Sequence, residues 1–304
     1  MAVHKRAYRP LARAELTPRW SRFFVLPRFA AREWRSSRLL TGYLMLSLVP
    51  PLVAAVVIYV FNSTLAQGLL GLGSGTSAWN FRIDGQFFSW LTNSQGMLAF
   101  LLIAWVGPGL VAPDLVNNAL PLYLSRPFSR AEYVLGRVTT LVLLGSIITW
   151  VPNLLLFWLQ AGLAGGGWWH QHLHIPWGIF AGSLLWLLLL ALLALALSAW
   201  VRWRIVASGL FVGLFFVSAG LGEAFNQALR TYWGRLFNVG YLIMNIWKDL
   251  FGVVVTERQR RGSIGDPTQL DIPVGYCWLM LLALAAGCLI LLSRRLQARE
   301  VVRG

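Results

Sequence analysis

Acidic and imidazole side chains, which supply most acids, bases and metal ligands in proteins, are scarce here: the 304 residues include 11 Asp and Glu and 4 His. Three of the histidines, His170, His172 and His174, alternate along one segment beside Trp168 and Trp169. A spacing of two favours an extended segment, in which three imidazoles could hold Zn²⁺ or Cu²⁺. Because neither a Cys nor a carboxylate is near them in the sequence, we expect a solvated loop beside an aromatic belt and no bound metal.

Asp114 is the one acidic residue inside a long apolar segment, and it stands near the end of that segment after Pro108 and Pro113. A carboxylate in this position usually forms an ion pair, for which Arg126 and Arg130 are the expected partners. A role in relaying protons or substrate is the alternative. The apolar segments contain no His and offer almost no nucleophile with a base, so neither a hydrolase nor an intramembrane protease is expected.

The glycine-rich stretch GLGSGTS occupies residues 71–77. A phosphate-binding P-loop needs a Gly-Lys-Ser/Thr step to hold the phosphates, and the only lysines of the chain are Lys5 and Lys248. We therefore expect no ATPase activity from this chain and no cofactor bound by it. Residues 62–95, which contain the stretch, are expected to form a polar external loop.

Hydrophobic residues make up 57% of the chain and charged residues 12%, about half the charged share of an ordinary soluble domain. A polypeptide with so little polar surface requires a bilayer as its solvent. Because backbone amides in hydrocarbon must be satisfied within their own segment, the expected fold is an all-α, polytopic membrane helical bundle. Six apolar runs have the roughly 20 residues that a helix needs to cross the bilayer. They are residues 39–61, 97–116, 138–159, 179–201, 205–222 and 274–292.

Basic residues are unevenly distributed along the chain. If the N-terminus lies inside the cell, 19 of the 26 Lys and Arg fall in the cytoplasmic segments 1–38, 117–137, 202–204 and 293–304. The positive-inside rule therefore places both termini in the cytoplasm and accounts for the net charge of +15 without nucleic-acid binding. The predicted organisation is a basic tail with an amphipathic helix at 1–38, a transmembrane domain at 39–293 and a basic tail at 294–304.

Two segments outside the spans are expected to lie along the membrane surface. Before the first span, arginines alternate with bulky apolar side chains, which is typical of an interfacial helix, and Pro18 and Pro27 predict at least one break in it. A disordered basic tail is the alternative. Residues 226–252 are amphipathic and should lie at the outer surface or dip into it. Trp233, Tyr241 and Trp247 are their expected interfacial anchors, and a seventh span over the same residues is the alternative.

Polar residues inside the spans have two open interpretations. Asn153 and Gln160 could line a substrate path or bond to neighbouring helices. Each of the first three spans also contains proline, which removes an amide donor and should bend its helix. Cys277 and Cys288 stand in one span about 16 Å apart, so they are expected to be packing residues rather than a disulfide.

The segment PLYLSRPFSRAEYVLGR, residues 121–137, carries the most information about function. It joins the second span, which ends in an acidic residue, to the third. A basic amphipathic helix precedes the first span, and an amphipathic segment ending in DLFG (Asp249–Gly252) precedes the last. This arrangement resembles the export-type (type 2) permeases of ATP-binding-cassette (ABC) transporters, over most of the chain from about Glu33 onward.

The resemblance implies the transmembrane subunit of an exporter in a bacterial cytoplasmic membrane, working as a homodimer or beside a second permease. Two separate ATPase subunits, which carry the ATP and Mg²⁺, would dock on the 117–137 loop, and membrane lipid is the other expected partner. Arginines of the loop could form bidentate contacts with carboxylates of the ATPase. The implied docking residues are Leu124, Ser125, Arg126, Pro127, Phe128, Ser129, Arg130, Glu132, Tyr133 and Arg137.

Two other classes of function fit the same composition. An ATPase-independent channel or secondary transporter would use Asp114 and the external charges, and internal repeats, which the sequence does not show, would support it. A non-transporting scaffold of a larger membrane complex would need the arginines of the loop only for assembly. The sequence leaves the chemical class of any cargo open.

Overall fold

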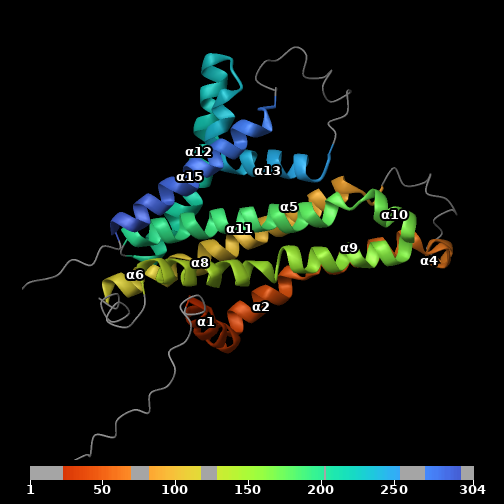
Figure 1. Cartoon of the computed structure of the whole chain (residues 1–304), viewed down its shortest axis with the longest axis horizontal. Coiled ribbons are helices and arrows are strands. Elements are labelled where there is room, and N and C mark those ends of the chain that lie inside the picture. The colour runs from red at the N-terminus through yellow and green to blue at the C-terminus, as the bar shows by residue number, and fades with distance from the viewer. Residues whose placement is uncertain (1–22, 70–81, 118–128, 202, 254–270, 296–304) are drawn as a thin grey trace, which may run out of the picture.

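The computed structural model describes residues 23–69, 82–117, 129–201, 203–253 and 271–295, which form helices and turns with no strand (Figure 1). Within these residues, six helical segments are long and apolar enough to cross a membrane. Each overlaps one of the six predicted spans, so the all-α, multi-pass membrane fold is confirmed. The six segments are Arg38–Asn62, Gly85–Asp114, Arg130–Ala164, His174–Trp200, Arg204–Leu229 and Val274–Arg295.

The first three spans are broken helices and the last three are continuous. The broken spans consist of α2 (Arg38–Ser47) with α3 (Val49–Asn62), α5 (Gly85–Val106) with α6 (Pro108–Val116), and α8 (Arg130–Ser146) with α9 (Trp150–Ala164). The continuous spans are α11 (His174–Trp200), α12 (Arg204–Leu229) and α15 (Val274–Arg295). Shorter elements are α1 (Val25–Ser36), α4 (Thr64–Leu69), α10 (Gly166–Gln171), the 3₁₀ helix η2 (Trp233–Phe237) and α13 (Val239–Leu250).

Prolines stand just beyond each of the three breaks, as predicted from the sequence. Pro50 and Pro51 lie in the first turn of α3, Pro108 begins α6, and Pro152 lies in the first turn of α9. Proline is tolerated in a first turn because the amide that it lacks has no partner there in any helix. The prolines therefore end one helix and allow a new one to start in a different direction.

The break before Pro152 exposes backbone carbonyls inside the bundle, and a side chain of another span satisfies them. Pro152 has no amide to offer the carbonyl of Ile148, four residues earlier. In the amide orientation that suits its neighbours, the fully buried Gln95 of α5 donates to the carbonyl oxygens of Ile148 at 3.3 Å and Thr149 at 3.0 Å. A polar residue of the second span thus stabilises the break in the third.

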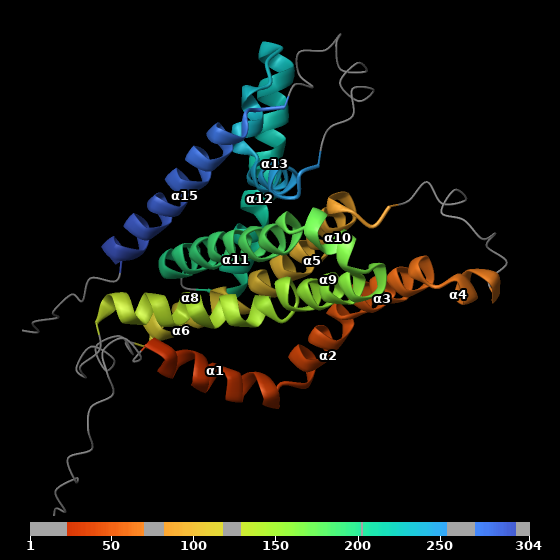
Figure 2. The same ribbon diagram turned by 45° about the vertical axis from the view of Figure 1, so that its right-hand side comes forward.

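Helix α11 forms the centre of the bundle (Figures 1 and 2). It packs against α5, α6, α8 and α9 on one side and against α12, α13 and α15 on the other. In the most apolar stretch of α11, 67% of the residues are buried, against 17% in the corresponding stretches of α12 and α15. The peripheral spans α2–α3, α12 and α15 therefore expose long rows of large apolar side chains, as helices facing lipid do.

The second span begins earlier than predicted, and residues 85–95 are helix rather than external loop. The side chain of Asp84 caps α5 by accepting hydrogen bonds from the backbone amides of Gln86 at 2.9 Å and Phe87 at 3.3 Å. Polar residues of the first turns, such as Thr92 and Gln95, lower the local hydropathy but are buried against other helices. Their polarity reflects internal hydrogen bonding, whereas the prediction attributed it to contact with water.

Helix α13 is packed into the bundle and does not cross a membrane. Its 12 residues extend about 18 Å, well short of the hydrocarbon core, so it is not a seventh span. Trp247 is only 3% exposed, and its indole Nε1 donates to the carbonyl of Gly182 in α11 at 3.0 Å. The prediction that Trp247 is an interfacial anchor is therefore wrong.

The connection from α13 to the last span is held by polar side chains of α13. The amide of Asn245 donates to the carbonyl of Ile272 at 2.8 Å, and the Tyr241 hydroxyl donates to Asp271 at 2.9 Å. Burial raises the pKa of Tyr241 above its ordinary value, so this hydroxyl keeps its proton well beyond neutral pH. In the last span, Cys277 and Cys288 are buried free thiols, which confirms them as packing residues.

We expect Trp247→Ala to lower the free energy of unfolding by about 3–5 kcal/mol, because it opens a cavity between α13 and α11 and removes a buried hydrogen bond. Trp233→Ala is the matched control, since Trp233 is 38% exposed and its loss should cost about 1 kcal/mol or less. Thermal unfolding of the purified chain in detergent measures both. Equal destabilisation by the two variants would contradict the internal position of Trp247.

Candidate functional site

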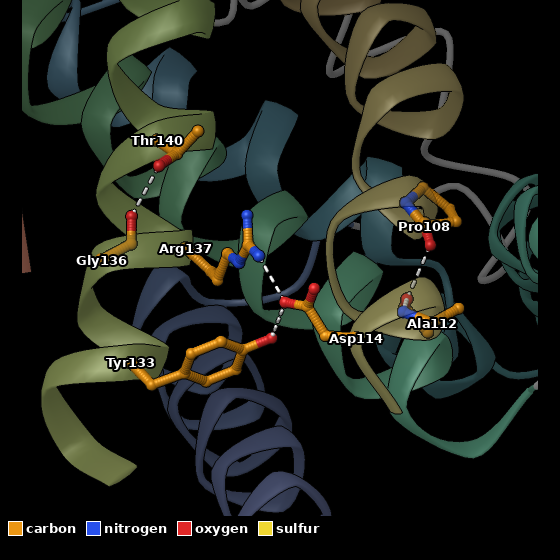
Figure 3. A network of polar contacts seen from close by, with 8 residues as sticks. Pro108, Ala112, Asp114, Tyr133, Gly136, Arg137 and Thr140 are labelled. Atoms are coloured by element: carbon orange, nitrogen blue, oxygen red, sulfur yellow. Dashed lines mark hydrogen bonds and ion pairs between the residues drawn. The ribbon is translucent and has the colours of Figure 1, made fainter. Parts of the chain in front are cut away.

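One end of the bundle gathers the arginines Arg130, Arg137, Arg204 and Arg295, and we call it the basic end. Asp114, near the end of α6, lies there opposite Tyr133 and Arg137 of α8 (Figure 3). The Tyr133 hydroxyl donates to Asp114 Oδ2 at 2.7 Å, and Arg137 Nη2 donates to the same oxygen in an ion pair. Residues four apart lie on one face of a helix, so Tyr133 and Arg137 reach the carboxylate together.

The three side chains are largely withdrawn from solvent. Tyr133 is buried, and the side chains of Arg137 and Asp114 are 12% and 16% exposed. Arg137 also lies against the Tyr133 ring, with its guanidinium carbon 5.4 Å from the ring centroid. Charges removed from water are costly to unpair, so this cluster should fix the second span to the third.

The predicted ion pair of Asp114 is present, but its partner is Arg137 and not the predicted Arg130. Arg130 is the first residue of α8 and is exposed, almost two helical turns before Arg137. Arg126, the other predicted partner, lies outside the described residues. The spacing of Tyr133 and Arg137 within a helix was the signal that could have identified the true partner.

The start of α8 is fixed by a capping box, which uses two of the predicted docking residues. Ser129 Oγ accepts a hydrogen bond from the backbone amide of Glu132 at 3.2 Å, and the Glu132 carboxylate accepts one from the Ser129 amide. The helix therefore begins at Arg130, so the predicted 117–137 loop ends at residue 129. Of the remaining predicted docking residues, Arg130, Tyr133 and Arg137 lie in α8. Leu124, Ser125, Arg126, Pro127 and Phe128 lie outside the described residues.

Helix α6, which carries Asp114, is held by a serine of α11. The Ser198 hydroxyl donates to the carbonyl of Pro108 at 2.8 Å and accepts from the amide of Ala112 at 2.9 Å. These two backbone groups, visible in Figure 3, would bond directly to each other in a regular helix. The inserted hydroxyl keeps both groups satisfied in the first turn of α6.

Helix α1 packs on α8 beside the ion pair. A Cβ at Gly136 would lie 2.7 Å from Leu26 Cδ1 and 2.9 Å from the carbonyl oxygen of Phe23, so only glycine allows this approach. Pro27 lies in the first turn of α1, where proline is tolerated, and Pro18, the other predicted site of a break, lies outside the described residues. Helix α8 therefore contacts α1 at Gly136 and α6 through the ion pair.

Asn153 and Gln160 bond to other spans. The Asn153 amide donates to Thr92 Oγ1 of α5 at 3.1 Å, and Gln160 Oε1 accepts from the Asn62 amide of α3 at 2.8 Å. Both residues are buried in the single chain. Of their two predicted roles, bonding between helices is the one that these contacts support.

The three histidines do not form an extended segment. His170 lies in α10, His172 follows that helix and His174 begins α11. The His172 ring stacks on Trp168, and its Nδ1 is 2.8 Å from the Trp168 carbonyl oxygen. Over the described ranges, no three His, Cys, Asp or Glu residues gather closely enough to hold a metal ion.

No protein-family model and no curated protein matches this chain. We therefore argue function from the residues and their geometry. At the basic end, one oxygen of Asp114 already accepts from both Tyr133 and Arg137, an arrangement suited to joining helices. Such a cluster ties the second span to the third.

We expect Asp114→Asn to destabilise the chain by about 3–5 kcal/mol, because it leaves the Arg137 charge buried without its counter-ion. Removing both charges with Asp114→Asn and Arg137→Gln should cost less than the sum of the single changes. Arg130→Gln is the matched control on the same helix, with an expected effect within about 0.5 kcal/mol. Thermal unfolding of the four variants in detergent tests this, and additive single changes would contradict a coupled pair.

Proposed function

We propose that this chain is the transmembrane subunit of an ABC exporter, driven by separate ATPase subunits that dock at the basic end. Three observations support the proposal: six candidate spans, the resemblance carried by residues 121–137, and the cluster that ties Asp114 to Arg137. The cluster is the observation on which the proposal chiefly rests. A docking segment can drive the bundle only if the helices on either side of it move together. The ion pair joins these two helices, α6 and α8.

The breaks in the spans suggest how the force would be used. Above the ion pair, the second span is interrupted at Pro108 and the third before Pro152. A push on the docking segment would tilt α6 and α8, with α1 held against Gly136, relative to α5 and α9. Movement of packed helices about such breaks is a common form of alternating access.

The chemistry of the cycle would belong to the partners. ATP and Mg²⁺ would be held by two ATPase subunits, and this chain would supply the substrate path with a second permease copy or paralogue. The gathering of Arg130, Arg137, Arg204 and Arg295 supports a cytoplasmic position of the basic end. A bacterial cytoplasmic membrane with both termini inside is the corresponding localisation.

The docking surface is tested by purifying the tagged chain from its own membranes and identifying co-purifying proteins by mass spectrometry. We expect wild type to recover a P-loop ATPase, and an Arg126→Glu, Arg130→Glu variant to recover roughly tenfold less or lower still, since both charges would repel the carboxylates they are proposed to bind. Arg230→Glu, at the far end of α12, is a charge-reversal control away from the proposed docking surface and should leave recovery unchanged.

Two results would count against the exporter. Absence of an ATPase from a wild-type chain that elutes as a single folded species would favour the channel, secondary transporter or scaffold. Equal loss of the ATPase from the Arg230→Glu variant would show that recovery responds to charge reversal anywhere on the chain and not to the proposed docking surface.

A further inference from the structure

An open groove lies at the basic end, between the end of α5 and the first turns of α12. Its volume is about 720 Å³. Its walls are largely apolar, with one charged side chain among them. The lining residues are Trp105, Trp203, Arg204, Ile205 and Ser208.

Arg204 brings a positive charge to this groove, and no carboxylate of the described residues pairs with it. The ion pairs within the described residues are those of Arg137 with Asp114 and Arg235 with Asp271. Arg204 Nη2 donates to the carbonyl of Trp105 at 3.0 Å. A guanidinium has five N–H donors, so this bond leaves others to bind a ligand that enters the groove.

The glycine at position 109 brings the guanidinium close to α6. A Cβ there would lie 3.0 Å from Arg204 Nε, tighter than ordinary van der Waals contact. The arginine is thus held against the second span by backbone on one side, while the groove opens on the other. Its position is set by the fold, independently of any ligand.

The apolar residues beside Arg204 face outward at the end of a candidate span. Trp203 is 74% exposed and Ile205 is 86% exposed, and exposed apolar side chains continue along α12. Tryptophan and arginine at a helix end are the composition of the boundary between headgroups and acyl chains. A ligand in the groove would meet a cation at its polar end and a hydrocarbon surface below it.

We propose that this groove binds an anionic phospholipid, with the phosphate on Arg204 and the acyl chains against Trp105, Ile205 and the exposed face of α12. A free phosphate ion would use the charge but leave the apolar walls in contact with water. A phospholipid satisfies both features, and arginine suits its phosphate because two N–H groups can bind two oxygens at once. The lipid would fill the angle by which α12 leaves α5 and join these helices where few protein contacts do.

The proposal is tested by native mass spectrometry of the full chain in detergent, titrated with palmitoyl-oleoyl phosphatidylglycerol or with the zwitterionic phosphatidylcholine of the same chains. We expect one phosphatidylglycerol to bind in preference to phosphatidylcholine. Arg204→Gln should weaken phosphatidylglycerol about fivefold and phosphatidylcholine less, because the choline cation offsets the attraction of its phosphate to Arg204. Ser208→Phe, which fills the groove and keeps the charge, should weaken both lipids.

Arg230→Gln is the matched control, because Arg230 ends the same helix at its opposite end and lies outside the groove. It should bind phosphatidylglycerol as wild type does. Undiminished binding by folded Arg204→Gln and Ser208→Phe variants would overturn the proposal, and so would equal weakening by Arg230→Gln. Displacement of the lipid by millimolar inorganic phosphate would reassign the site to the free ion.

Discussion

The structure depends on one constraint: every backbone amide and carbonyl away from water must have a partner, even where proline has broken the helix. The Ser198 hydroxyl of α11 joins the carbonyl of Pro108 to the amide of Ala112 in the broken second span. Gln95 of the second span meets the carbonyls of Ile148 and Thr149 in the broken third span. The breaks in the second and third spans are therefore each stabilised by a polar side chain from another span, which is one reason why polar residues are buried in so apolar a chain.

The breaks divide the bundle into two parts, and different side-chain contacts hold each part together. At the basic end, α1, α6 and α8 are joined by the Asp114 cluster and by close packing at Gly136. Beyond the breaks, α5 and α9 are joined by Asn153 and Thr92. Hydrogen bonds across a break are easier to rearrange than a continuous helix is to bend, so relative motion would be concentrated at the breaks.

Hydropathy identified the six spans because crossing a bilayer imposes a minimum apolar length, which a sequence displays directly. The wrong predictions concern polar or aromatic residues that form hydrogen bonds inside the bundle and not at its surface. Residues 85–95 were assigned to a loop because they include Thr92 and Gln95, which are buried and bonded to other helices. Trp247 was predicted at the membrane surface, but an indole suits an interface and a core equally well. Only the three-dimensional structure shows that its N–H donates to the Gly182 carbonyl inside the bundle.

The arginines that predicted the orientation of the chain also bond to neighbouring helices. Arg137 pairs with Asp114, Arg204 donates to the Trp105 carbonyl, and Arg295 donates to the Ala199 carbonyl while lying against the Trp200 ring. These three residues connect neighbouring helices at the basic end in addition to contributing charge. Arg130, exposed at the start of α8, has no such contact within the described residues. Arg130 therefore contributes charge at the basic end without joining helices there, whereas Arg137, Arg204 and Arg295 do both.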